Sequence, residues 1–389
     1  GAVGTLYTVT GKNGAMMRAG CELDTPELGV TLDAGVECYV TEEAKNAKGS
    51  LRAHIVLFSA NGGKYEAIDG WCTCKFLTKV ASKVPVPAVG ATPFAAVFPR
   101  PTGEGTVLLF PGQGAQKVGM LAPYADTPGV KSMFKEASKI FGKDLLELVE
   151  KGPVEELNDT RYSQVCVFLT SMAAVKKLQR EDPKAVASCA VTAGFSLGEY
   201  SALTFAGVME MDTALKLLKV RGEAMGAACD LAPSGMMTVV GLEDDALKAM
   251  MPDGVTIANQ LFPKGRVLSG PKDGLAKVEA AVKEAKIAGS KTIVQPVSGA
   301  FHSPFMATAA DALKAALASV AFSAPARTVY SNVNGKPHSS DPDKIKQAMC
   351  EQLMAGVLWE DTIRDMAKKY PDVSAFYEPA PGRQLTSMM

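Results

Sequence analysis

A serine between glycines is the residue of this chain best suited to covalent chemistry. Ser196 lies at the centre of the sequence GFSLG, residues 194–198. Residues 189–193 before it have the composition of a strand, and residues 199–203 after it favour the start of a helix. Glycines on both sides allow a sharp strand-to-helix turn that exposes the serine oxygen, and the helix N-terminus directs amide groups at developing negative charge. The pattern predicts that Ser196 is a nucleophile.

A serine hydroxyl needs a base within hydrogen-bonding reach. The chain has three histidines. His54 belongs to a β-rich segment ahead of a proline-rich linker, and His338 lies in the polar turn PHSSDP. His302, in SGAFHSP, follows a predicted strand in the domain after the linker, which also contains Ser196. By elimination we predict that His302 is the base; a buried structural histidine is the alternative. No carboxylate occupies a recognisable position of a catalytic triad.

Attack by a serine creates an oxyanion that needs preorganised donors. Gln113 lies in FPGQGAQ, where an apolar strand ends in a glycine turn that can direct the Gln113 amide into a cleft. The amide of Leu197 directly follows the nucleophile. The same turn could be a phosphate-binding loop, but it lacks the Lys-Ser/Thr pair of a P-loop and the third glycine of a dinucleotide fingerprint. We therefore predict an oxyanion hole at Gln113 and Leu197.

A helical stretch after the serine carries a candidate for recognising a carboxylate. Arg221 lies in LLKVRGEAM, residues 217–225. A guanidinium group there can form a two-pronged pair with a substrate carboxylate, which would separate a carboxylated acyl group from an uncharged one. The alternative is a surface salt bridge. The sequence leaves both interpretations open.

The N-terminal residues, which precede all of the candidate site residues, predict a separate small domain. Short runs in residues 5–82 alternate apolar and polar side chains between turn signals, which is typical of antiparallel β structure. The stretch AIDGWCT, residues 67–73, resembles the Gly-Trp strand of SH3-like barrels. We assign residues 1–83 to a small all-β SH3-like barrel and favour a tethering or structural role over peptide binding. Residues 84–105, rich in Pro and Ala, form an extended linker.

Residues 106–389 predict an α/β domain. The apolar run at 106–110 is typical of a strand covered on both faces, and strand and helix signals alternate after it. This pattern indicates a hydrolase-like core with a parallel sheet. Within it, residues 234–298 predict the order strand, helix, strand, strand, helix, strand of an inserted ferredoxin-like subdomain. We expect a cleft between the two subdomains, with predicted strands at 236–240, 256–259, 266–269 and 292–297 and helices at 244–251 and 275–285.

The composition argues against nucleic-acid binding, a zinc site and a membrane span. Forty-one basic residues balance forty-one acidic ones, so no global field favours nucleic acid. The eight cysteines are scattered without zinc-ligand spacing, so we expect reduced thiols and no metal site. No apolar run reaches the roughly 18 to 20 residues of a membrane span. The chain starts at Gly1 rather than Met, and we expect that a targeting segment was removed.

Seven segments of the second domain together resemble the malonyl-CoA:acyl carrier protein transacylases of fatty-acid synthesis. They follow the order of that family over residues 106–389. The segments are FPGQGAQKVGM (110–120), GFSLGEYSALTFAGV (194–208), VRGEAM (220–225), IANQLFPKGRVLSG (257–270), PVSGAFHSPFM (296–306), VYSNVNG (329–335) and EPAPGRQL (378–385).

The resemblance implies a role for each matching residue. Ser196 is the acyl-bearing nucleophile and His302 the general base and acid, so that the catalytic pair is a dyad. The family orients its histidine through a backbone carbonyl, here that of Gln352. The remaining implied roles are an oxyanion hole (Gln113, Leu197), a carboxylate clamp (Arg221), and residues around the acyl pocket or His302 (Gln164, Met225, Asn259, Phe301, Asn332).

The resemblance also implies an activity. A malonyl group passes from malonyl-CoA to the phosphopantetheine thiol of acyl carrier protein through a malonyl-serine, feeding fatty-acid or polyketide synthesis without a cofactor. A thioesterase using the same serine remains an alternative, as does a scaffold or carrier-docking subunit that binds an unknown protein through its SH3-like domain. We expect an organelle, with the plastid stroma favoured over the mitochondrial matrix.

Two positions depart from the family pattern. Phe195 stands where many members have His, although members from organelles also have Phe, and we expect activity to survive. Ala380 replaces a glycine of the usual Glu-x-Gly-Pro-Gly run, which affects the expected loop geometry. The β domain is not part of the family pattern, so no family property transfers to it.

Overall fold

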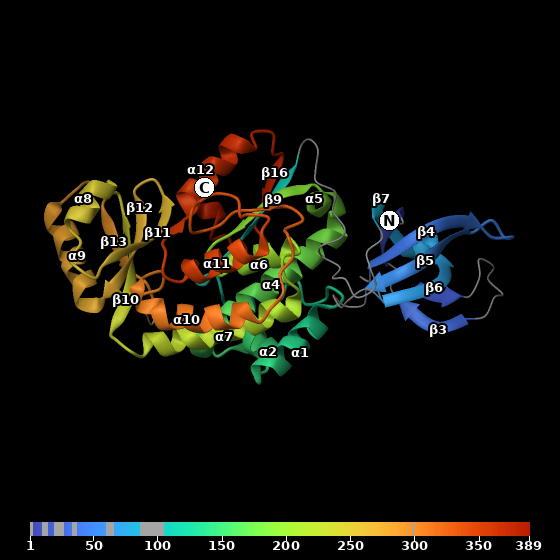
Figure 1. Ribbon diagram of the computed structural model, residues 1–389, viewed down its shortest axis with the longest axis horizontal. Helices are drawn as coiled ribbons and strands as arrows, with labels where there is room; N and C mark the ends of the chain where they lie inside the picture. The colour runs from blue at the N-terminus through green and yellow to red at the C-terminus, as the bar shows by residue number, and fades with distance from the viewer. Residues whose placement is uncertain are drawn as a thin grey trace.

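A computed structural model describes residues 3–9, 15–18, 27–32, 37–59, 66–85, 105–297 and 299–389. The predicted linker at 84–105 lies almost entirely outside these ranges. No helix among the described residues is both long enough and apolar enough to cross a membrane. The chain folds into an N-terminal β unit, an α/β core and a small subdomain inserted into that core (Figure 1).

The N-terminal unit is one antiparallel sheet of seven strands in the order β3-β2-β6-β5-β4-β1-β7. Its core is a cluster of buried apolar side chains that includes Ala53, Ile55 and Cys72. The His54 and Trp71 rings stack on neighbouring strands with their centroids 4.9 Å apart. The strands are β1 (Val3–Val9), β2 (Ala15–Arg18), β3 (Glu27–Leu32), β4 (Glu37–Lys45), β5 (Leu51–Ser59), β6 (Glu66–Thr73) and β7 (Leu77–Pro85), with the short helix η1 (Cys74–Phe76) before β7.

The α/β core contains the parallel sheet that the sequence predicts. Its order is β14-β9-β8-β16, and each neighbouring pair is parallel. Strand β8 is buried along its whole length, as its uninterrupted apolar run requires. The strands are β8 (Thr106–Phe110), β9 (Cys189–Gly194), β14 (Thr328–Val329) and β16 (Ala375–Tyr377).

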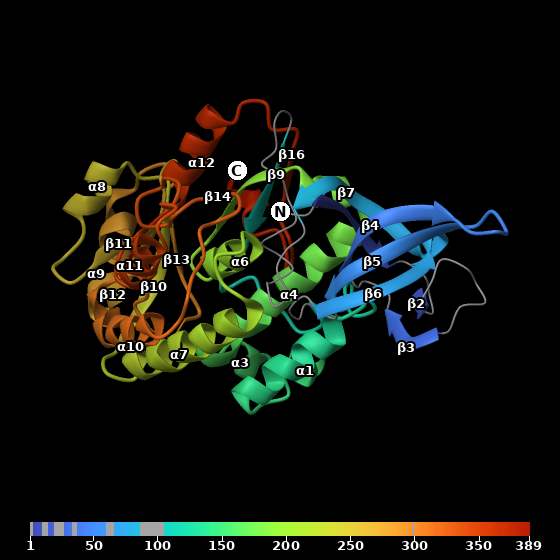
Figure 2. The ribbon, with the colours of Figure 1, turned by 45° about the vertical axis from the view of Figure 1, so that its right-hand side comes forward.

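Helices cover this sheet, and two of them are buried on nearly every face. All eight residues of α6 (Gly198–Phe205) are buried, and so is most of the first two thirds of α4 (Thr160–Glu181). Asp159 precedes helix α4 and caps it, because its side chain accepts a hydrogen bond from the Arg161 amide. Figure 2 shows α7 (Met211–Cys229) packed beside α10 (Ala307–Ala318). The other helices are α1 (Val130–Phe141), α2 (Leu145–Lys151), α3 (Val154–Leu157), α5 (Pro183–Ala187), η2 (Pro304–Met306), α11 (Pro342–Gln352), α12 (Trp359–Lys369) and η3 (Thr386–Met388).

The inserted subdomain follows the predicted order of elements with shifted ends. They are β10 (Ser234–Val240), α8 (Asp244–Ala249), β11 (Thr256–Phe262), β12 (Gly265–Pro271), α9 (Lys272–Ala285) and β13 (Lys291–Val294). Its sheet has the order β13-β10-β12-β11-β15. The fifth strand was not predicted: β15 (Val357–Leu358) comes from the core and pairs parallel with β11. The core therefore supports the subdomain directly beside Asn259.

Candidate active site

Ser196 occupies a strained turn between β9 and α6. Its φ is 50°, a left-handed conformation that is rare for residues other than glycine and concentrates at functional sites. Steric constraints require glycine at both flanking positions. A Cβ on Gly198 would lie 2.1 Å from the Phe110 carbonyl oxygen, and a Cβ on Gly194 would lie 1.9 Å from the Gly198 carbonyl. The GFSLG sequence therefore forms a sharp strand-to-helix turn, here called the elbow, with the geometry that a nucleophile elbow requires.

Ser196 and His302 are hydrogen-bonded. The Ser196 Oγ lies 2.7 Å from His302 Nε2, and His302 Nδ1 lies 2.8 Å from the backbone carbonyl oxygen of Gln352. A carbonyl oxygen can only accept, so in the neutral ring Nδ1 carries the proton and Nε2 presents its lone pair to the serine. The geometry is that of a serine with a base held by a backbone carbonyl.

The protonation of His302 suits a base. Burial is the main cause that lowers its pKa to about 4, and the positive charge of Arg221 lowers the pKa further. The hydrogen bond to the Gln352 carbonyl acts in the opposite direction. With this pKa, His302 is neutral near pH 7 and can accept the Ser196 proton.

Arg221 is a buried cation beside the nucleophile. Its side chain comes from α7 and is 1% exposed, and burial lowers its pKa. One guanidinium nitrogen lies 3.3 Å from Ser196 Oγ and 3.2 Å from Gln352 Oε1, and the other terminal nitrogen donates to Gln164 Oε1. Its hydrogen-bond partners are thus uncharged, and within the described ranges no carboxylate forms an ion pair with it. The buried Glu199 carboxylate, which shares Gln352 with Arg221, acts on the cation only from beyond ion-pair distance. This environment excludes the surface salt bridge that the sequence had left open.

The serine and the histidine open into a cleft between the core and the inserted subdomain. The cleft has a volume of about 370 Å³. Apolar side chains of the small subdomain, such as Met236 and Leu261, face the elbow across it. Six of the predicted site residues line it: Gln113, Ser196, Met225, Asn259, Phe301 and His302.

The other predicted site residues are buried behind this cleft. Asn332 supports the elbow, because its Oδ1 accepts from the Ser196 amide at 2.6 Å and its Nδ2 donates to the Gly194 carbonyl at 2.7 Å. Gln164 accepts from Arg221. Leu197 is 0% exposed at the start of α6. The predicted residues that do not line the cleft are Gln164, Leu197, Arg221, Asn332 and Gln352, and all five are buried.

The turn that carries Gln113 is held by side chains from other elements. Thr160 Oγ1 donates to Gln113 Oε1 at 3.2 Å. Gln384 Nε2 donates to the Gln113 carbonyl at 3.3 Å, and Gln384 Oε1 accepts from the Gly112 amide at 2.9 Å. The backbone that would present the Gln113 amide to the cleft is therefore fixed from both sides.

Sequence reasoning missed a buried polar pair next to the elbow. Glu199, in the first turn of α6, is 0% exposed and lies 2.6 Å from His338 Nε2. His338 lies in the polar turn PHSSDP, yet only 2% of its side chain is exposed. A glutamate three residues after a nucleophile would have been a usable signal for the first partner. No local pattern indicates the second, because 139 residues separate the two.

The two departures from the family pattern lie in well-packed surroundings. The Phe195 ring lines the cleft and meets the Trp359 ring edge-on, with 5.6 Å between the centroids. Ala380 is buried, and its carbonyl oxygen accepts a hydrogen bond of 2.6 Å from Ser171 Oγ.

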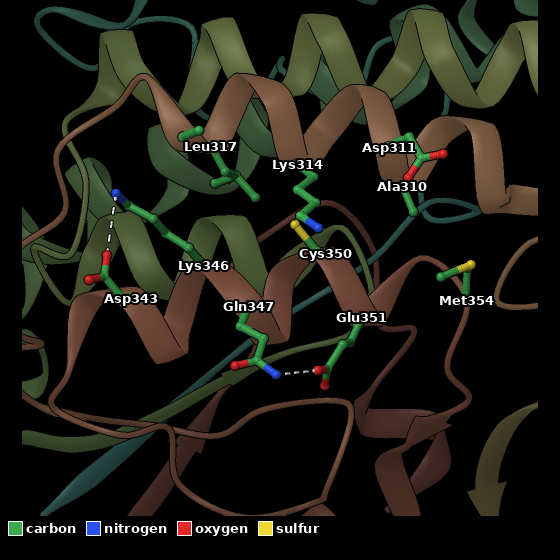
Figure 3. A pocket seen from close by; sticks show the side chains of 11 residues that line it. Ala310, Asp311, Lys314, Leu317, Asp343, Lys346, Gln347, Cys350, Glu351 and Met354 are labelled. Atoms are coloured by element: carbon green, nitrogen blue, oxygen red, sulfur yellow. Dashed lines mark hydrogen bonds and ion pairs between the residues drawn. The ribbon is translucent and has the colours of Figure 1, made fainter.

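A larger hollow lies between α10 and α11 (Figure 3). Its volume is about 670 Å³. Lys314 and Cys350 meet between the two helices, and Lys346 pairs with Asp343 at 3.8 Å on its rim. It contains neither a hydrogen-bonded nucleophile and base nor an uncompensated buried charge. Chemistry rather than volume therefore identifies the smaller cleft as the candidate active site.

The chain is similar to known acyltransferases. The family model described as acyl transferase domain matches residues 107–383. The mitochondrial malonyl-CoA-acyl carrier protein transacylase of Mus musculus is 37% identical over 305 residues, which cover 75% of this chain and 79% of the relative. The transacylase of Escherichia coli K12 is 36% identical over 286 residues, covering 72% of this chain and 90% of the relative.

Solved structures agree with these relatives. The malonyl-CoA:acyl carrier protein transacylase of Xanthomonas oryzae matches with a TM-score of 0.68 and 31% identity, over 74% of this chain and 91% of that one. A malonyl-transacylase solved in complex with its type II polyketide acyl carrier protein matches with a TM-score of 0.67 and 33% identity, over 73% and 92% of the two chains. The α/β fold is thus shown.

The comparisons correct the expected compartment. The similar proteins of Mus musculus, Homo sapiens and Drosophila melanogaster are all named as mitochondrial. The expectation of a plastid was wrong, because it rested on the family resemblance and on a sequence that starts at Gly1, and neither distinguishes one organelle from another. The family model and the extent of similarity show that this chain belongs to the acyl transferase domain family, among the malonyl-CoA:acyl carrier protein transacylases.

Proposed function

We propose that this chain transfers a malonyl group from malonyl-CoA to the phosphopantetheine thiol of acyl carrier protein, through a malonyl-Ser196 intermediate. The observation that carries the proposal is the buried Arg221 guanidinium, 3.3 Å from Ser196 Oγ and without a carboxylate partner within the described ranges. A buried charge is costly unless it is paired. The free carboxylate of a malonyl group supplies the missing anion beside the reacting atom, which an acetyl group cannot do.

The first half-reaction acylates the serine. Ser196 Oγ attacks the thioester carbonyl while His302 Nε2 takes the serine proton. The Gln113 and Leu197 amides stabilise the oxyanion. The carbon–sulfur bond then breaks, and the coenzyme A thiolate leaves with the proton from His302. Malonyl-Ser196 remains, with its carboxylate paired to Arg221.

The second half-reaction reverses these roles with another thiol. The phosphopantetheine thiol gives its proton to His302 and attacks the malonyl ester. The bond to Ser196 Oγ breaks, and His302 returns the proton to the serine. Malonyl acyl carrier protein leaves, and the enzyme regains its starting state. The two thioester partners supply all the reacting groups, so the proposed reaction uses no cofactor.

The remaining site residues have supporting roles in this proposal. Met225, Asn259 and Phe301 line the cleft and contact the acyl group. Gln164 orients Arg221, and Asn332 holds the elbow. The Gln352 carbonyl keeps His302 in the tautomer that accepts the serine proton.

We also propose a division of the chain into residues 1–83, 84–105 and 106–389. The strand order β13-β10-β12-β11 with intervening helices supports a ferredoxin-like subdomain at 234–298. The SH3-like class of residues 1–83 stays a prediction, supported by antiparallel pairing alone, because the described strands follow a linear order in which no pair joins β3 to β7. Docking of a protein partner by this unit also stays a prediction.

The decisive experiment is a transfer assay with purified components. Radioactive malonyl-CoA is incubated with the enzyme, with and without phosphopantetheinylated acyl carrier protein. We expect label on the enzyme alone, and then on the carrier when it is added. Release of free malonate in place of transfer would identify a thioesterase. Absence of label on both proteins would refute the proposal and favour the alternative that the chain is a scaffold.

A further inference from the structure

A buried carboxylate under the elbow takes no part in the two half-reactions above. Glu199 is 0% exposed and lies three residues after the nucleophile. Its Oε2 accepts from Gln352 Nε2 at 2.8 Å and from the Asn332 amide at 3.1 Å. Gln352 holds His302, and Asn332 holds the Ser196 amide. Both members of the dyad are thus supported by residues that share one carboxylate.

His338 satisfies the other oxygen of that carboxylate. Its Nε2 donates to Glu199 Oε1 at 2.6 Å. The His338 backbone amide donates to the Val329 carbonyl at 2.7 Å, and Val329 pairs with Thr192 on the strand that leads to Ser196. The imidazole is therefore fixed relative to the strand that carries the nucleophile. A buried carboxylate oxygen left without a donor would carry a large desolvation cost.

The orientation of the Gln352 amide depends on Glu199. Gln352 Nε2 donates to Glu199 Oε2 and, at 3.0 Å, to the Ser196 carbonyl, while Gln352 Oε1 accepts from Arg221 at 3.2 Å. Arg221 can only donate and the carboxylate can only accept, so the two groups set which end of the amide faces each of them. A displaced Glu199 would disturb the residue whose own backbone carbonyl orients His302.

We propose that Glu199 and His338 are positioning residues of the transfer reaction. His338 fixes the Glu199 carboxylate, and the carboxylate fixes Gln352 and Asn332, which hold His302 and Ser196 in reacting geometry. Neither residue lines the cleft, so the pair acts on turnover rather than on substrate binding. The transfer readout of this inference rests on the proposed function.

Two amide substitutions of His338 test the pair. In His338→Gln the side-chain nitrogen takes the place of Nε2 and can donate to Glu199. In His338→Asn it takes the place of Nδ1 and falls short. We expect His338→Gln to stay within about twofold of wild type in kcat, and His338→Asn to lose about tenfold, since small misplacements of reacting groups cost this much or more. The KM for malonyl-CoA should change less than about twofold in both.

The rate at which a fluorophosphonate labels Ser196 provides a second readout that needs no malonyl substrate. It should fall about tenfold in His338→Asn and persist in His338→Gln. Lys336→Ala is the control, because it removes a side chain near the same turn that pairs with Asp365 and contacts neither Glu199 nor His338. Equal losses in both His338 variants would reduce the pair to a structural role, and wild-type rates in both would refute it. If the wild type labels but transfers no malonyl group, the proposed function fails while the labelling pattern still decides the inference.

Discussion

The Arg221 guanidinium lies 3.3 Å from the Ser196 hydroxyl and also donates to the neutral amide oxygens of Gln164 and Gln352. A cation in this position does two things at once. It offers a binding partner for a carboxylate at the reacting atom, and its charge helps to keep His302 unprotonated. Substrate choice and the readiness of the base therefore depend on the same side chain.

Replacement of the nucleophile should remove all covalent chemistry. We expect Ser196→Ala to abolish labelling by radioactive malonyl-CoA and to lower transfer by about 10⁴-fold or more. Ser201→Ala on the following helix α6 is the control, since Ser201 is buried and does not line the described cleft. Labelling that persists in Ser196→Ala would show that another residue carries the acyl group.

The loss of Arg221 should change substrate preference. Arg221→Ala is expected to lower kcat/KM for malonyl-CoA by about 100-fold, because a hydrogen-bonded charge pair contributes on the order of 2–3 kcal/mol, and to affect acetyl-CoA much less. Lys216→Ala is the control, as it removes an exposed charge of the same helix. An unchanged ratio of the two substrates would contradict the clamp.

The pH dependence should report His302. Only the neutral ring accepts the Ser196 proton, and its pKa is about 4, so the labelling rate should stay level from pH 8 to pH 5 and fall below that. An uncharged serine reagent avoids titration of the substrate. Arg221→Gln removes a charge that lowers the pKa of His302, and the fall should move to higher pH. A midpoint near the ordinary histidine value of 6.5 in the wild type would contradict the buried base.

The elbow glycines should tolerate no side chain. In Gly198→Ala the new Cβ would lie 2.1 Å from the Phe110 carbonyl oxygen, so we expect a loss of about 3 kcal/mol in the free energy of unfolding, or failure to fold. Gly235→Ala is the matched control, because its Cβ would meet only Leu275 at 3.9 Å. Equal urea midpoints for the two variants would show that the elbow relaxes.

A buried ion pair ties the inserted subdomain to the core. Arg266 on β12 donates to Asp244 at 2.8 Å and to Glu360 of α12 at 2.9 Å. Arg266→Met removes the subdomain partner of Glu360. We expect a loss of about 3 kcal/mol in the free energy of unfolding, measured by thermal or urea unfolding. The exposed pair of Lys264 and Glu243 is the comparison, and Lys264→Met should cost less than about 1 kcal/mol. A smaller loss for Arg266→Met than for Lys264→Met would contradict this role.

Much of the core fold was predictable because its signals are local. The run at 106–110 is apolar without interruption, which only a strand covered on both faces explains, and the structure confirms it. Strand ends were less accurate. The strand predicted at 256–259 continues to Phe262, because pairing with β12 extends it beyond the local pattern. Strand β15, two residues long, has no pattern of its own, since its partner β11 lies about a hundred residues earlier.

In the candidate site, too, the features with local sequence signals were predictable and the long-range contacts were not. The elbow was predictable from the sequence, since its strand, turn and helix lie within residues 189–205 and only glycine fits at its closest approaches. The scarcity of histidine made His302 the choice for the base. Two features became visible only in the folded chain: Arg221 is buried rather than exposed, and Glu199 contacts His338. Those contacts join segments far apart in the chain, and burial and pairing across such distances follow from packing rather than from any local spacing of residues.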